Sequence, residues 1–161
     1  MKNRLPLRVL FLGIFLAAGC AEGRLYPVRG PYSTQSPVPV FIAKASGIFN
    51  SGNISVVLEN GEKGKGRWVR AQADPVSTGD SASSRSAATN LTSVWDTVYG
   101  QGFYVSHVLG NNLFARAEVN GDRGTTLQME MYRSAGGSED SPINIKGVAR
   151  DNKSNVYKVV F

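Results

Sequence analysis

Short runs of alternating apolar and polar residues, each ended by turn-forming residues, constrain the fold of this chain most strongly. Residues 113–119 alternate in this way, and residues 125–132 repeat the pattern. The segment between them, Asn120-Gly121-Asp122-Arg123-Gly124, is rich in residues that tolerate tight turns. A period of two is typical of a strand that buries one face. We therefore expect an antiparallel hairpin whose second strand buries Met129 and Met131.

Similar runs occur along the rest of the chain and bring the predicted total to about eight strands. The other runs are residues 40–49, 53–59, 64–69, 103–109, 143–149 and 156–161. Between the second and third of these, Asn60-Gly61 can adopt the positive φ values of a hairpin turn. The fold class that we expect is all-β, a small antiparallel barrel or sandwich.

One short helix is predicted at Leu91–Val98. Asn90 is a favourable N-cap residue, and apolar residues then repeat at helical spacing, so this helix would cover one end of the sheet. For residues 103–109 a helical continuation is the alternative to a strand. Residues 75–90 are rich in Ser and Ala, which indicates a surface loop.

The N-terminal residues have the order of an export signal. Basic residues at the start precede an apolar stretch from Val9 to Phe15, and small residues then lead to Cys20, the only cysteine. The ending Leu16-Ala17-Ala18-Gly19-Cys20 resembles the lipobox of bacterial lipoproteins. This resemblance implies that Cys20 carries acyl chains such as palmitate and becomes the first mature residue.

The residue after Cys20 indicates to which membrane a lipoprotein of this type would be sorted. In lipoproteins of this type an aspartate after the cysteine often signals retention at the inner membrane. This chain has Ala21 there, so the resemblance implies the outer membrane. The alternative is an ordinary signal peptide, cleaved near Gly19 or Ala21, that leaves Cys20 as a free thiol or removes it.

We expect three segments: a signal peptide at residues 1–19, a lipidated N-terminus and Pro-rich tether at residues 20–39, and a single β-domain at residues 40–161. The prolines of the second segment disfavour a helix or a central strand. Removing 19 of the 161 residues leaves 142, with 15 basic and 12 acidic side chains and a net charge of +3 rather than +6. That charge includes no basic cluster of the kind that indicates nucleic-acid binding.

Candidate catalytic residues are few. His107 is the only histidine and the only conventional base near neutral pH. A hydrolase of envelope material would use His107 with Ser106 or a carboxylate such as Asp96. On a strand, however, Ser106 and His107 point to opposite faces.

Carboxylates offer a second route to catalysis. Glu118 and Glu130 lie on neighbouring predicted strands and could form a glycosidase pair. Their positions fall on the polar face, where we expect Arg116 or another basic neighbour to pair with them. No spacing of a metal site or a phosphate-binding loop occurs, so we expect no metal or cofactor.

Three aromatic residues fall where a polar face is expected: Phe114, Tyr132 and Tyr157. Such a strip could bind a sugar, a peptide or a partner sheet. The alternative is that a second layer or a loop covers this face. We expect a lipoprotein anchored in the outer membrane, whose non-catalytic β-domain binds an envelope protein, glycan or lipid or gives structural support; the alternative is the hydrolase built on His107.

Overall fold

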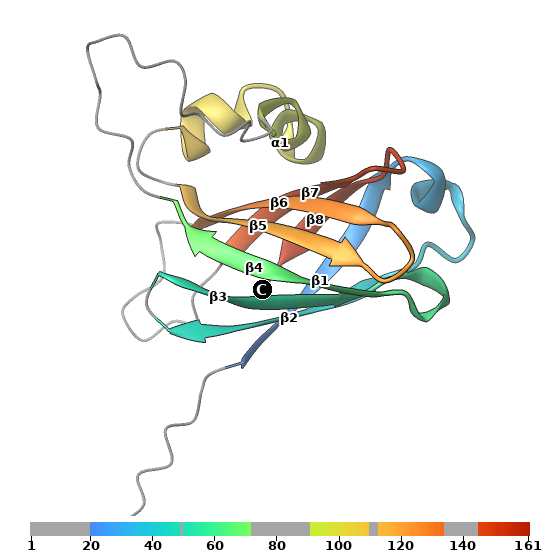
Figure 1. The fold of residues 1–161 in the computed structure, drawn as a ribbon. Helices are drawn as coiled ribbons and strands as arrows, with labels where there is room; N and C mark the ends of the chain where they lie inside the picture. Colours follow the sequence, from blue (N-terminus) through green and yellow to red (C-terminus); the bar gives the residue numbers. More distant parts are fainter. Residues whose placement is uncertain (1–19, 49, 72–90, 110–112, 134–144) are drawn as a thin grey trace, which may run out of the picture.

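Eight antiparallel strands close into a barrel in which each strand pairs with its neighbours in sequence and β1 pairs with β8 (Figure 1). The computed structural model describes residues 20–48, 50–71, 91–109, 113–133 and 145–161. The strands are β1 (Cys20–Arg29), β2 (Phe41–Ile48), β3 (Ser51–Val57), β4 (Lys63–Arg70), β5 (Leu113–Gly121), β6 (Thr126–Arg133), β7 (Ile145–Asp151) and β8 (Val156–Val160). The all-β prediction is confirmed, and the architecture is a barrel rather than a sandwich.

The barrel interior is a packed apolar core. Strand alternation turns one side of every strand inward, and residues such as Leu25, Leu127 and Val159 are fully buried there. Large side chains fill the space over inward-facing glycines, since the Trp68 ring lies beside Gly52 and the Phe161 ring lies over Gly23. An eight-stranded barrel is narrow enough for side chains to fill in this way.

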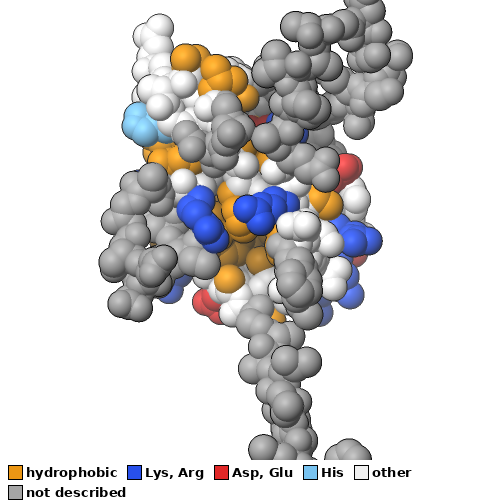
Figure 2. Space-filling view, turned by 90° about the vertical axis from the view of Figure 1, so that its left-hand side faces the viewer, with side chains coloured by type: hydrophobic (Ala, Val, Ile, Leu, Met, Phe, Trp, Pro, Cys, Tyr) orange, Lys and Arg blue, Asp and Glu red, His pale blue; other side chains and the backbone are white. Residues whose placement is uncertain are grey.

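The two ends of the barrel differ. At the end that carries Cys20, partly buried aromatic rings, among them Trp68, Phe114 and Phe161, pack against the core. Figure 2 looks onto this end and shows apolar side chains at its centre with basic side chains beside them. The opposite end holds the tight turns and the short 3-10 helices Pro31–Thr34 and Glu59–Gly61.

The prediction of a tether over residues 20–39 is wrong, because Cys20–Arg29 forms β1 and lies between β2 and β8. Pro27 does not prevent this. It is buried opposite Tyr157, and the register shifts between Pro27 and Arg29, which is where a strand tolerates a residue without an N–H. The following turn is also docked, since the Tyr32 amide donates to Asn155 Oδ1 at 3.0 Å.

Helix α1 (Thr92–Tyr99) covers the outer face of β7 and β8, and its side chains reach β6. Val94 and Trp95 are buried, as the helical spacing predicts. Trp95 Nε1 donates to Glu130 Oε2 at 2.9 Å, and Arg116 Nε donates to Glu130 Oε1 at 3.2 Å. The buried carboxylate of Glu130 therefore has a partner on each oxygen and links the helix to the sheet. The predicted cap Asn90 and the loop at residues 75–90 lie outside the described residues.

Residues 103–109 do not form the predicted strand. Tyr104–Val108 is a π-type helical turn, so the helical alternative is the correct one. Side chains four residues apart stack in sequence: Trp95 on Tyr99 at 5.6 Å between ring centroids, Tyr99 on Phe103 at 4.7 Å, and Phe103 on His107 at 4.4 Å. The contact between Phe103 and His107, which an extended backbone could not form, stabilises the helical turn.

We predict that Trp95→Phe destabilises the protein by about 1–3 kcal/mol, because it keeps a ring in place but removes a hydrogen bond to a buried carboxylate. Urea unfolding followed by circular dichroism measures the change. The matched control is Trp68→Phe, since Trp68 Nε1 donates to the Ser46 carbonyl at 3.1 Å in a half-buried position where water can replace it. Equal losses for the two variants would contradict the role given to Glu130.

Candidate functional site

Cys20 is the first residue of β1 and is exposed. It pairs with Ser46 of β2, and both lie on the outer face because the alternate residues Gly23 and Leu25 face the core. The strand therefore holds the backbone of Cys20 against the barrel wall. Sequence reasoning identified this cysteine but placed it on a tether.

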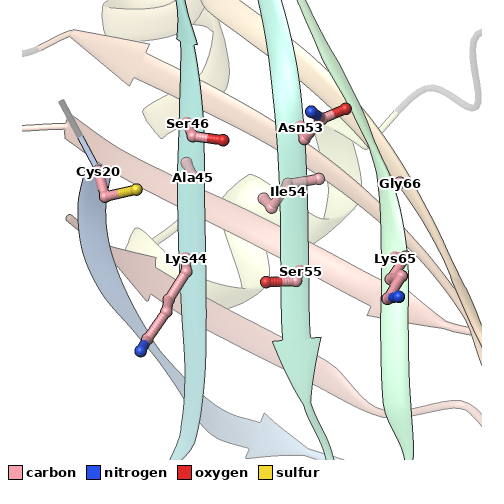
Figure 3. A pocket seen from close by; sticks show the side chains of 9 residues that line it. All are labelled: Cys20, Lys44, Ala45, Ser46, Asn53, Ile54, Ser55, Lys65 and Gly66. Carbon is pink, nitrogen blue, oxygen red and sulfur yellow. The ribbon is translucent and has the colours of Figure 1, made fainter. Parts of the chain in front are cut away.

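A shallow groove of about 460 Å³ runs across the outer face beside Cys20. Figure 3 shows Lys44 and Lys65 on either side of Ser55, with Ser46 and Asn53 further along the same strands in the row of Cys20. Its floor is formed mainly by short side chains on β2 and β3, and a lysine stands on each side of it. No sequence signal marked it, because its residues come from four strands and meet only through the sheet register.

His107 is exposed on the π-type turn. Its Nδ1 lies 2.8 Å from Ser106 Oγ, a contact that a helical turn allows and a strand does not. Ser106 Oγ donates its hydrogen to the Gly102 carbonyl at 2.8 Å, which leaves the hydroxyl oxygen to accept a hydrogen bond from the Nδ1–H tautomer of His107. Asp96 accepts the Tyr104 amide at 3.2 Å instead of orienting the imidazole. The pair lacks the oriented base that nucleophilic catalysis requires.

The two candidate carboxylates differ in their surroundings. Glu130 is 4 % exposed and pairs with Arg116, the partner expected from the sequence, but it lies under α1 rather than on a solvated face. Glu118 is exposed and lies opposite Gln128. Since one is engaged by Arg116 and Trp95 and the other faces solvent, they do not form an acid–base pair.

The structure does not place the three candidate aromatics on one exposed strip. Tyr157 is fully buried inside the barrel, and Tyr132 is 8 % exposed beneath α1. Phe114 is half-buried at the Cys20 end, stacked on Trp68 at 6.2 Å with the Arg133 guanidinium over its ring at 5.2 Å. A register shift between Leu113 and Ala115 puts Phe114 with the core, which alternation alone did not predict.

A buried polar network, which sequence reasoning missed, lies at the end opposite Cys20. Asp151 Oδ1 accepts the Lys153 and Asn155 amides, and its Oδ2 accepts Asn155 Nδ2 and the Tyr157 hydroxyl at 2.7–2.8 Å. Burial is the main cause that raises the pKa of the Tyr157 hydroxyl, and the hydrogen bond to the Asp151 carboxylate raises this pKa further. Each buried polar side-chain atom in the described residues has a partner. The network therefore stabilises this end of the barrel.

Glu62 holds the neighbouring turn. Its Oε1 accepts the Thr125 amide at 3.0 Å, its Oε2 accepts the Thr125 hydroxyl at 2.7 Å, and Lys153 Nζ lies 3.6 Å away. Burial by itself raises the pKa of the Glu62 carboxyl, but the hydrogen bonds from Thr125 and the charge of Lys153 outweigh it and hold the pKa below its usual value of 4.5. Glu62 therefore stabilises the fold as a carboxylate.

Comparison with known protein families, curated proteins and solved structures finds no match for this chain. Among the described residues, no three His, Cys, Asp or Glu side chains are grouped so that they could hold a metal ion. No helix in that part of the chain has the length and apolar character needed to cross a membrane.

We predict that Glu62→Gln destabilises the protein by about 1–3 kcal/mol at neutral pH, because it removes charge-assisted hydrogen bonds. The folded-state pKa lies below the usual 4.5, so the carboxylate's contribution is present above that pH and is lost as the pH falls through the folded-state pKa. Urea unfolding across a pH series should show the gap between wild type and variant closing in acid. The exposed Glu118→Gln is the control, and a gap independent of pH would refute the prediction.

For the turn that carries His107, we predict that Ser106→Ala changes stability by less than about 0.5 kcal/mol, as expected for an exposed side chain. We also expect the wild-type protein to resist labelling by a fluorophosphonate, since Ser106 is not activated. Mass spectrometry reads the labelling. Modification of wild type that Ser106→Ala or His107→Ala abolishes would restore the hydrolase hypothesis.

Proposed function

We propose that this protein is an outer-membrane lipoprotein, acylated on Cys20, whose non-catalytic barrel binds a component of the cell envelope or gives it structural support. The observation that carries the proposal is the lipobox-like ending Leu16–Cys20, which leads to the only cysteine in the chain. The chain has no second thiol with which Cys20 could form an intramolecular disulfide, and acylation would give this cysteine a role.

The position of Cys20 supports acylation further. Its side chain is exposed on the outer face of β1, so acyl chains attached there would not disturb the core. Stable anchoring requires more than one chain, since a single one gives only reversible membrane binding. The several acyl chains implied by the resemblance to lipoproteins meet that requirement. Ala21 in place of aspartate supports the outer membrane as the destination.

Binding or support is favoured over catalysis by the contacts of the candidate residues. Ser106 and His107 touch one another, but the hydroxyl is committed to Gly102 and Asp96 to the Tyr104 amide. The Glu130 carboxylate is engaged by Trp95 and Arg116. A packed interior and a rigid closed sheet suit a domain that presents its outer surface to a partner.

The anchor is tested by intact-mass analysis and fractionation of the protein expressed in a bacterium. We predict that wild type gains the mass of acyl chains and fractionates with the outer membrane, whereas Cys20→Ala does neither. Ser46→Ala is the matched control, because Ser46 is the cross-strand neighbour of Cys20 and its loss should leave acylation intact. An unmodified wild-type protein found in the soluble fraction would overturn the proposal.

A further inference from the structure

The outer face of β1–β4 presents three parallel rows of residues, which we call the anchor face. The first row contains the proposed acylation site. Cys20 lies opposite Ser46, Ser46 opposite Asn53, and Asn53 opposite Arg67, so one residue from each strand contributes. Because β1 is part of the barrel wall, acyl chains on Cys20 would hold this face close to the bilayer, without a spacer between them.

The second row crosses the groove beside Cys20. Glu22 lies opposite Lys44, Lys44 opposite Ser55, and Ser55 opposite Lys65. Neighbouring strands are about 4.8 Å apart, so the backbones of β2 and β4 lie about 10 Å apart with only a serine between the lysines. Figure 3 shows both lysines on the same face as the Cys20 thiol. This spacing leaves room for a phosphate between two ammonium groups.

The third row combines apolar and basic side chains. Ile42 and Val57 lie opposite one another at the centre, flanked by Arg24 on β1 and Lys63 on β4. Ile42 is 44 % exposed, Val57 50 % and the neighbouring Tyr26 36 %. Aliphatic and tyrosine side chains with basic residues beside them are suited to the boundary between lipid headgroups and acyl chains.

Charge is concentrated on the anchor face. It carries five basic residues (Arg24, Lys44, Lys63, Lys65 and Arg67) and one acidic residue, Glu22, a net charge of +4. Residues 20–161 as a whole carry +3, so those outside the anchor face carry a net charge of −1. The two ion pairs between described residues, Arg116–Glu130 and Lys153–Glu62, lie elsewhere. Arg67 donates to Ser51 Oγ at 3.5 Å and lies opposite Glu118 of β5, so Arg24, Lys44, Lys63 and Lys65 are the basic groups that an anionic surface would meet.

Among the described residues, no helix lies over the anchor face. Helix α1 lies over the opposite wall, where the outward side chain of Val148 is fully buried (Figure 1). We propose that the anchor face lies flat on an anionic phospholipid surface, with lipid phosphates bound between Lys44 and Lys65. This inference rests on the proposed function and specifies the lipid chemistry and the orientation of the barrel.

Lysine footprinting tests the orientation. Protein purified from the bacterial envelope is reconstituted in vesicles of phosphatidylcholine with phosphatidylglycerol, in phosphatidylcholine alone, and in detergent micelles. We expect acetylation of Lys44 and Lys65 by a water-soluble reagent to slow several-fold in the anionic vesicles, relative to Lys146 on β7. High salt should reduce the protection, because it screens the attraction.

Charge-reversal variants provide the matched comparison. Lys44→Glu with Lys65→Glu should abolish the protection of Lys63, which stays as the reporter on the same face. Lys146→Glu with Arg150→Glu reverses the same number of charges on β7, which pairs with none of β1–β4, and should leave the protection of Lys63 unchanged. Loss of protection in both double variants would show that net charge alone matters and would overturn the assignment to this face.

The outcomes separate the two proposals. If mass analysis finds an acylated protein whose Lys44 and Lys65 react equally fast in anionic vesicles and in micelles, the anchor stands and the docking inference fails. If Cys20 carries a free thiol, the lipoprotein proposal fails. The same chain is then coupled through Cys20 to a maleimide-headgroup lipid in the vesicles, and the footprint of Lys44 and Lys65 still decides whether this face docks.

Discussion

The pairing of β1 with β8 is the constraint on which the rest of this structure depends. A sheet of seven strands would leave two edges with unpaired backbone groups, whereas β1 satisfies both by lying between β2 and β8. The pairing also completes the core, because Leu25 and Val159 face each other inside the barrel and are fully buried. Closure through β8 covers β1 from Arg24 to Arg29, and Cys20 before it is held at the barrel wall by its pairing with Ser46 of β2.

Closure gives the barrel two unlike walls. On one side α1 packs Trp95 against Glu130 and Tyr132. The side chains of Glu130 and Tyr132 point outward from β6 and would face water without the helix, which buries both. On the other side no described helix covers β1–β4, whose outer face carries five basic residues and one acidic residue. The helix therefore decides which part of the outer barrel surface is shielded from solvent.

The placement of Cys20 changes what an acyl anchor would do. A flexible spacer of 20 residues would let a domain take many orientations above a bilayer. A cysteine in the first position of a paired strand restricts the domain to orientations in which the outer face beside Cys20 is near the lipid. The basic side chains of Lys44 and Lys65 lie on that face, so lipid attachment and electrostatic attraction would act on the same surface.

Local patterns in the sequence determined the strands from Phe41 onwards, the hairpin turns, the helix around Trp95 and the prominence of Cys20, because alternation, turn chemistry and helical spacing act within a few residues. They could not identify β1, since its prolines argue locally against a strand and only pairing with β2 and β8 outweighs that preference. They also could not place Phe114, which a register shift moves to the core, or Glu130, which α1 buries from far along the chain. Tertiary structure decided these points because the energy of burying a side chain depends on which distant segment covers it, and no local pattern records that segment.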